Sequence, residues 1–217
     1  MGVILLYKID TMLNDFLQPV DNEIIAEYYT ENIYAKEYIH LFQQVQTLES
    51  YQVAVLGVAD YRGYISNKGT EHAADEVRKQ LYQYAAFTNG IQLLDLGNIK
   101  AGETYVDTLV ALVEILHELF KQNVITIILG GDAALASAQF KAYEIFENPI
   151  TVAHVASKVI WDNSDVDIYK TYLKDFFLSS FLEKYNLVAY QSYFLQEKQL
   201  SFLHINYQDF LCVAEIN

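Results

Sequence analysis

Residues 124–138 read VITIILGGDAALASA, and this stretch decides the fold class. The apolar, β-branched run that opens it predicts a buried strand, and the two glycines allow a tight turn. Helical spacing then runs from about 133 to 147, and Asp132 is expected to cap that helix. A buried strand that leads directly into a helix is typical of α/β folds with a parallel sheet.

The same alternation recurs along the chain. Further strands are predicted at 51–58, 91–97, 150–156, 187–191 and 210–216, and further helices at 71–87, 104–122, 168–185 and about 195–203. Thr70 is expected to cap the first helix, and Thr104 with Asp107 to form a capping box on the second. The second helix has an expected apolar stripe of Val106, Leu109, Val110, Val113, Leu116 and Leu119.

This order predicts an α/β protein with three layers, α/β/α, around a mostly parallel sheet, because right-handed βαβ crossovers place helices on both faces. Residues 1–48 read as a mostly helical N-terminal extension, and residues 49–217 as the α/β domain.

Composition excludes several classes of function. The formal net charge of −14 repels phosphate backbones, so nucleic acid is not an expected partner. No apolar run is long and uncharged enough for a membrane span. Cys212 is the only cysteine, so no intrachain disulfide can form, and a cytoplasmic location is expected.

Candidate site residues follow from the topology. In open α/β sheets ligands bind at the carboxyl ends of the strands, which here places Asp60, Asn98 and residues 130–133 on the functional edge. No dinucleotide or P-loop fingerprint is present. His154 is the one histidine near this edge, and a satisfied core histidine is the expected reading. The acidic segment 161–167 lacks the glycine and glutamate of a calcium loop, which favours a solvated loop.

Three segments resemble the ureohydrolase family, which comprises arginase, agmatinase and formiminoglutamase. They are VAVLGVADYRGYISNKGTEHAADEVRKQL, LLDLGNIKAGETYVDTLVALVEIL and VITIILGGDAALASA, and the tail is closer to a divergent bacterial arginase-like group. The first matches the family at Gly57, Asp60, Gly63, Gly69 and Arg78, with Ala59, Ala73 and Ala74 in place of Pro, Gly and Pro.

The resemblance implies a dinuclear manganese site, in which a bridging hydroxide attacks a poor carbon electrophile. The ligand positions depart from the family's pattern. Ala133 stands where the family has a histidine of the GGDH motif. The next ligand motif falls on Ala156, Lys158 and Ile160 in the preferred gapless register. A second register, with a seven-residue gap, places Asn163, Asp165 and Asp167 in ligand positions.

Asp60, Gly130, Gly131, Asp132 and Ala133 are therefore interpreted as vestigial motif positions, and no cofactor is expected although the family uses manganese. The expected function is a non-catalytic binding or scaffold protein, or a fragment. The alternative is a working metallohydrolase that cleaves C–N bonds of guanidino or formimino compounds.

The resemblance also implies that the family's last two strands, which lie centrally in its sheet, are missing before Asn217. Strand edges would then be exposed. We therefore expect a homo-oligomer or a partner chain, and a small guanidino-type compound as a possible ligand.

Overall fold

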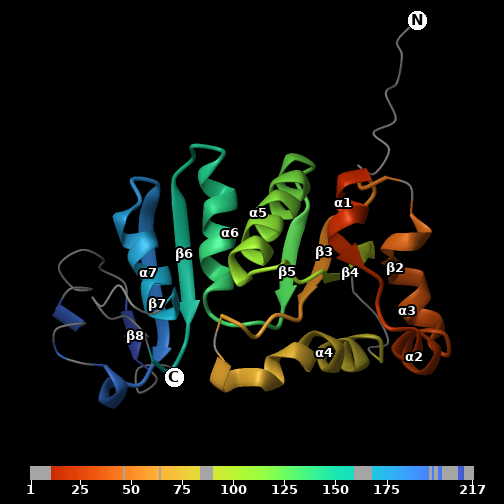
Figure 1. The fold of residues 1–217 in the computed structure, drawn as a ribbon, viewed down its shortest axis with the longest axis horizontal. Helices are drawn as coiled ribbons and strands as arrows, with labels where there is room; N and C mark the ends of the chain where they lie inside the picture. The colour runs from red at the N-terminus through yellow and green to blue at the C-terminus, as the bar shows by residue number, and fades with distance from the viewer. Residues whose placement is uncertain are drawn as a thin grey trace, which may run out of the picture. The chain divides into compact units, whose positions relative to one another are not determined.

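The structure is a computed structural model that describes residues 11–45, 47–63, 65–83, 90–158, 168–195, 197, 200–201 and 210–212 (Figure 1). It divides into two compact units, Met1–Ala138 and Gln139–Asn217. Each unit is described by itself below.

The first unit is built on a sheet with strand order β1-β4-β3-β5 (Figure 1). Its three main strands, β3 (Val53–Val58), β4 (Leu93–Ile99) and β5 (Ile125–Leu129), are parallel. Two short strands also pair with β4: β2 (Ile39–Leu41) runs parallel to it and β1 (Leu17–Gln18) antiparallel. All of β4 and nearly all of β3 are buried, as expected for strands covered on both faces.

Helices cover both faces of this sheet. The α-helices are α1 (Thr11–Phe16), α2 (Asn22–Ile24), α3 (Ile33–Tyr38), α4 (Ala73–Leu81), α5 (Tyr105–Lys121) and the first turn of α6 (Leu135–Glu144). A π-helix spans Ile25–Tyr29, and 3₁₀ turns span Phe42–Gln44 and Ile65–His72. Val55 packs with Ile24 and Tyr82 in one cluster, which places α2 and α4 on one face. α1 and α5 contact each other, and α5 packs on β4 and β5.

The capping box of α5 is confirmed: the Thr104 side chain accepts from the Asp107 N–H, and the Asp107 side chain accepts from the Thr104 N–H. The expected cap on α4 is wrong, because a 3₁₀ turn precedes the helix and its N-cap is His72. The expected stripe of α5 is confirmed at Leu116 and Leu119, which are fully buried, but it is wrong at Val106 and Val110, which are 53% and 55% exposed. The buried face consists of Tyr105, Thr108, Ala111, Leu112, Ile115, Leu116 and Leu119.

The second unit contains a parallel sheet of order β6-β7-β8. Its strands are β6 (Ile150–Val155), β7 (Leu182–Tyr190) and β8 (Phe210–Cys212), and its helix α7 spans Ile168–Leu178. A 3₁₀ turn spans Ser192–Phe194. The helix expected over 168–185 therefore ends early, and its last residues belong to β7. Phe140 of α6 stacks on Phe176 of α7, with ring centroids 4.5 Å apart.

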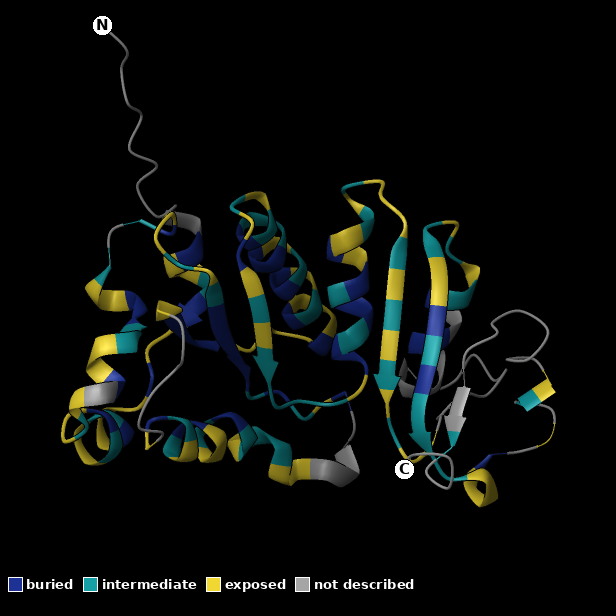
Figure 2. Ribbon diagram, turned by 180° about the vertical axis from the view of Figure 1, so that it is seen from behind, coloured by how far each residue is buried: buried dark blue, intermediate teal, exposed yellow. Residues whose placement is uncertain are grey.

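The fold class is confirmed as α/β with mostly parallel sheets. Among the described residues, β5 and β6 each end their own sheet, with no strand on the outer edge. Exposed residues run along both strands in Figure 2, including Ile125 (65%), Ile127 (43%) and Val155 (71%). No helix in the described part of the chain is long and apolar enough to cross a membrane.

Candidate functional site

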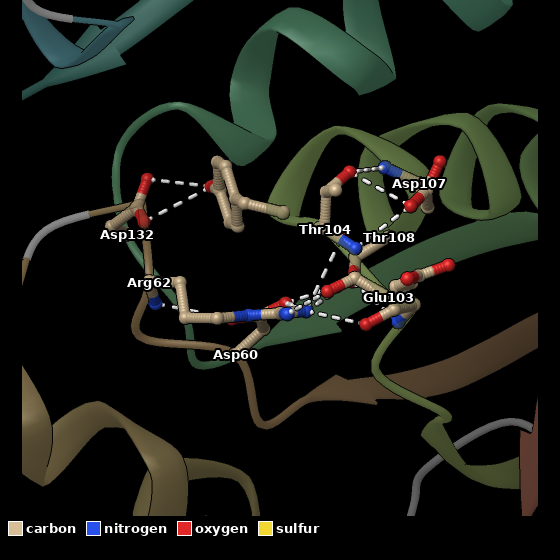
Figure 3. A network of polar contacts seen from close by, with 9 residues as sticks. Asp60, Arg62, Glu103, Thr104, Asp107, Thr108 and Asp132 are labelled. Carbon is tan, nitrogen blue, oxygen red and sulfur yellow. Dashed lines mark hydrogen bonds and ion pairs between the residues drawn. The ribbon is translucent and has the colours of Figure 1, made fainter.

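The carboxyl ends of β3 and β5 bring the predicted site residues of the first unit together (Figure 3). β3 ends at Val58, two residues before Asp60, and β5 ends at Leu129, directly before the glycine pair. Gly130 and Gly131 have φ values of 82° and 75°, a left-handed conformation that other residues adopt only at a cost. The glycines therefore form the turn that the sequence predicts.

Asp60 is held by an arginine two residues later in the chain. Its carboxylate is buried and accepts from Nε and Nη2 of Arg62, at 3.0 and 2.7 Å, and from the Thr108 hydroxyl at 2.7 Å. Burial alone would raise the pKa of this carboxyl, but these hydrogen bonds outweigh burial and place the pKa below its ordinary value. Asp60 is thus a paired anion.

The two terminal nitrogens of the Arg62 guanidinium also donate to oxygens around the start of α5 (Figure 3). These acceptors are the carbonyls of Gly102, Glu103 and Thr104, at 2.9, 2.8 and 3.3 Å, and Thr108 Oγ1 at 3.3 Å. We call Asp60 and these acceptors the guanidinium cradle. A planar group with five N–H donors matches such a ring of acceptors.

Asp132 has different partners. It accepts from the Tyr105 hydroxyl at 3.0 Å through both carboxylate oxygens, and from the Ala134 N–H at 2.7 Å. The second bond closes the turn at residues 132–134, and α6 begins at Leu135, two residues later than the sequence predicts, so Asp132 caps this turn and not the first residue of the helix. Burial nevertheless raises the pKa of this carboxyl above its ordinary value. A Cβ on Gly63 would lie 2.1 Å from Asp132 Oδ2, so the loop after β3 closes directly over the carboxylate.

Asn98, also predicted at this edge, belongs to a buried structural network. Its Oδ1 accepts from NH1 of Arg78 at 2.6 Å, and the Arg78 Nε donates to Asp95 Oδ2 at 2.9 Å. Arg78 and Asp95 are both fully buried. A Cβ on Gly57 would collide with Asn98 Oδ1, so a glycine is needed where β3 passes this network. The side chain of Asn98 therefore belongs to the buried core.

His154 lies in β6 of the second unit, and its Nδ1 is 2.5 Å from the Tyr185 hydroxyl. Burial lowers the pKa of this imidazole, which favours its neutral form. The pairing with Tyr185 agrees with the satisfied histidine that the sequence favours, but His154 is half-buried and does not lie in the core.

Three residues of the network were not singled out from the sequence: Arg62, Tyr105 and Thr108. Tyr105 and Thr108 lie three residues apart in the first turn of α5, after the carboxyl end of β4, and that position was the available signal. For Arg62, the only signal in the sequence was its position two residues after Asp60.

A dinuclear manganese centre needs carboxylate oxygen and imidazole ligands from several side chains. The side chain of Ala133 has no atom that can bind a metal. In the described part of the chain, no group of three His, Cys, Asp or Glu residues is placed to hold a metal ion. The described residues of this edge therefore do not fit such a centre. Lys158 is exposed and Ala156 follows β6, while Ile160, Asn163, Asp165 and Asp167 lie outside the described residues.

The family model of the Arginase family matches residues 51–172, more than half of the chain. The chain belongs to the arginase family. This match covers the sheet of the first unit from β3 onward, together with the loops of the candidate site.

Solved structures of arginase-family enzymes share the fold. Formiminoglutamase of Trypanosoma cruzi, solved with Mn²⁺, is 15% identical with a TM-score of 0.70, over 79% of this chain and 63% of that one. Formimidoylglutamase of Bacillus subtilis is 16% identical with a TM-score of 0.74, over 86% and 62%. The chain thus spans less than two thirds of either enzyme. No curated protein matches it.

The expectation that no cofactor is involved is wrong. The arginase family and the solved formiminoglutamase with Mn²⁺ point to manganese as the cofactor of this group. That expectation rested on Ala133 and on the preferred register, in which the next ligand positions fall on Ala156, Lys158 and Ile160, whereas the second register left Asn163, Asp165 and Asp167 as possible ligands.

Proposed function

We propose that this arginase-family chain acts as a binding or scaffold domain, and that the edge formed by Asp60 and Asp132 does not carry out hydrolysis. The observation that supports this proposal is that both carboxylates already have hydrogen-bond partners within the chain. Asp60 is neutralised by Arg62, and Asp132 is covered by the Gly63 loop and bound by Tyr105. A two-metal hydrolysis needs open carboxylate and imidazole ligands around a water molecule.

The proposed ligand is a small guanidino-type cation. Arg62 supports this proposal because its guanidinium fits the acceptors of the cradle, and a guanidino ligand would bind there by displacing the Arg62 side chain. The net charge of −14 raises the local concentration of cations. A cytoplasmic location is part of this proposal, supported by the single cysteine.

A second candidate function is a working manganese hydrolase of guanidino or formimino compounds. The solved formiminoglutamase with Mn²⁺ favours it. Its ligands would include Asn163, Asp165 and Asp167, and the Asp165→Ala and Asp167→Ala variants would then lose the metal together with activity.

The experiment joins metal content with turnover. The chain is saturated with Mn²⁺, dialysed and analysed for metal, and then assayed with arginine, agmatine and formiminoglutamate for release of urea, ammonia or formamide. Absence of turnover, together with arginine binding in calorimetry that Asp60→Asn weakens, supports the binding role. Manganese-dependent turnover overturns it and selects the second candidate.

A further inference from the structure

Arg62 fills the guanidinium cradle with a side chain that the cradle does not fully enclose (Figure 3). Its Nε, Nη1 and Nη2 all donate to acceptors of the cradle, yet its side chain is 36% exposed, whereas that of Asp60 is only 3% exposed. The Arg62 N–H donates to Asp60 Oδ1 at 3.0 Å, a contact within one loop. The side chain can therefore leave the cradle towards solvent without opening the core.

The acceptors of the cradle are held in place by contacts that do not involve Arg62. Thr108 is fully buried, and its hydroxyl accepts from the Gly102 N–H at 2.9 Å and donates to Asp60 Oδ2 at 2.7 Å. The capping box with Asp107 fixes Thr104. Because Thr108 bridges the two sides of the cradle, the ring of acceptors should persist when the Arg62 side chain leaves.

The arrangement of these acceptors favours a planar cation with several donor nitrogens. The carboxylate of Asp60 accepts from Nε and Nη2, while the carbonyls of Gly102 and Glu103 accept from Nη2 and Nη1. An ammonium group carries all of its donors on one nitrogen and cannot span such a ring. The hydrogen bond to Asp60 raises the pKa of the Arg62 guanidinium, and the charge of Asp107 raises it further, so the site stabilises a positive charge.

We propose that Arg62 is an internal competitor: its side chain closes the guanidinium cradle, and a ligand with a terminal guanidinium or amidinium group binds by taking its place. The apparent affinity of the chain is then lowered to the fraction of molecules in which Arg62 has left the cradle. A side chain tethered two residues from Asp60 competes at an effective concentration on the order of millimolar.

This inference rests on the proposed binding role and adds its regulation. The cradle is closed by default, and it opens when ligand is in excess or when Arg62 is drawn away. The ligand class also becomes narrower, because an aliphatic amine without a guanidinium or amidinium end cannot replace the donors of Arg62.

The test compares ligand binding by the full chain with and without the Arg62 side chain. Arg62→Ala removes the side chain beyond Cβ, and ethylguanidine supplies the missing atoms. Binding is measured by calorimetry and by thermal unfolding, with ethylammonium as the control ligand. Lys121→Ala is the matched control variant, because it also removes one positive charge, from an ion pair with Glu118 at the other end of α5.

Arg62→Ala should bind ethylguanidine at least about tenfold more tightly than wild type or Lys121→Ala, and the ligand should raise its midpoint of thermal unfolding. Ethylammonium should bind none of these chains, and Asp60→Asn added to Arg62→Ala should abolish the binding of ethylguanidine. Equal affinities of wild type and Arg62→Ala for ethylguanidine overturn the proposal, as does absence of binding to Arg62→Ala or equally tight binding of ethylammonium.

Circular dichroism verifies that each variant is folded. If Arg62→Ala does not fold, Arg62→Leu keeps an aliphatic stem and is probed with the guanidinium ion itself under the same criteria. The outcomes separate this proposal from the proposed function. Equal affinities in wild type and Arg62→Ala overturn the competition and leave the binding role intact. Binding by Arg62→Ala alone supports the competition and counts against a binding role of the unaltered chain.

Discussion

The guanidinium of Arg62 lies side-on against the carboxylate of Asp60, with Nε 3.0 Å from Oδ1 and Nη2 2.7 Å from Oδ2. The same guanidinium donates to carbonyls more than 40 positions along the chain. This ion pair lies within the loop after β3, and the further hydrogen bonds of Arg62 join that loop to the start of α5. The stability of this corner should therefore depend on the charge of Asp60.

Asp60→Asn should lower the free energy of unfolding by about 2 kcal/mol at pH 7, since it removes charge-assisted hydrogen bonds from a buried carboxylate. The folded-state pKa of Asp60 is depressed. Its contribution is therefore fully present above the unfolded pKa of about 4 and is lost as the pH falls through the folded pKa. Urea unfolding from pH 7 to pH 3 checks this: the difference in free energy of unfolding between wild type and Asp60→Asn should stay constant above about pH 4 and begin to narrow below it. Glu114→Gln, on the exposed side of α5, is the control and should track wild type. A gap that stays constant with pH would show that the charge of Asp60 does not matter.

Asp132→Asn should show the opposite pH dependence. Burial raises the folded pKa of this carboxyl, so its ionisation opposes folding. The contribution of Asp132 is fully present below the unfolded pKa of about 4 and is lost as the pH rises through the folded pKa. Asparagine keeps an oxygen that can accept from the Ala134 N–H and the Tyr105 hydroxyl. Relative to wild type, the variant should therefore gain stability between acidic and neutral pH in the same urea series. A loss of stability at pH 7 would contradict this and would indicate that the ionised carboxylate is required.

What could be predicted from the sequence was local. The capping box of Thr104 and Asp107 depends on two residues three apart, and the glycine turn after β5 on two neighbours. The pair of Tyr105 and Asp132 was missed because the two residues are 27 positions apart and meet only once β4 and β5 lie in one sheet. The predicted apolar stripe of α5 was wrong at Val106 and Val110 for a related reason. The helix carries apolar residues around most of its circumference, so packing on the sheet, and not periodicity, decided that Val106 and Val110 stay exposed.

Gly63→Ala should destabilise the first unit by about 1–3 kcal/mol, the usual cost of overpacking. A Cβ at this position would lie 2.1 Å from Asp132 Oδ2 and 2.3 Å from Tyr105 Cζ, so the loop would have to lift from the carboxylate. Gly69→Ala is the matched control, because no described atom lies within 4 Å of a Cβ at that position. Chemical denaturation of both variants checks the prediction. Equal effects would mean that the loop accommodates a side chain over Asp132 without cost.

Arg78→Met should be the most damaging substitution, with a loss of about 3–5 kcal/mol, because it leaves a buried carboxylate without its cation. Arg78 and Asp95 are fully buried, and the arginine also donates to Asn98 Oδ1 and to the Gly97 carbonyl. Lys79→Met, one residue along α4, removes an ion pair with the exposed Glu76 and should cost less than about 1 kcal/mol. Thermal and urea unfolding compare the two variants. If Arg78→Met does not fold, Arg78→Lys keeps a charge but loses the fork of donors, and it should remain folded with a measurable loss. If Arg78→Met lowered the free energy of unfolding no more than Lys79→Met does, the buried network of Arg78, Asp95 and Asn98 would not stabilise the carboxyl end of β4.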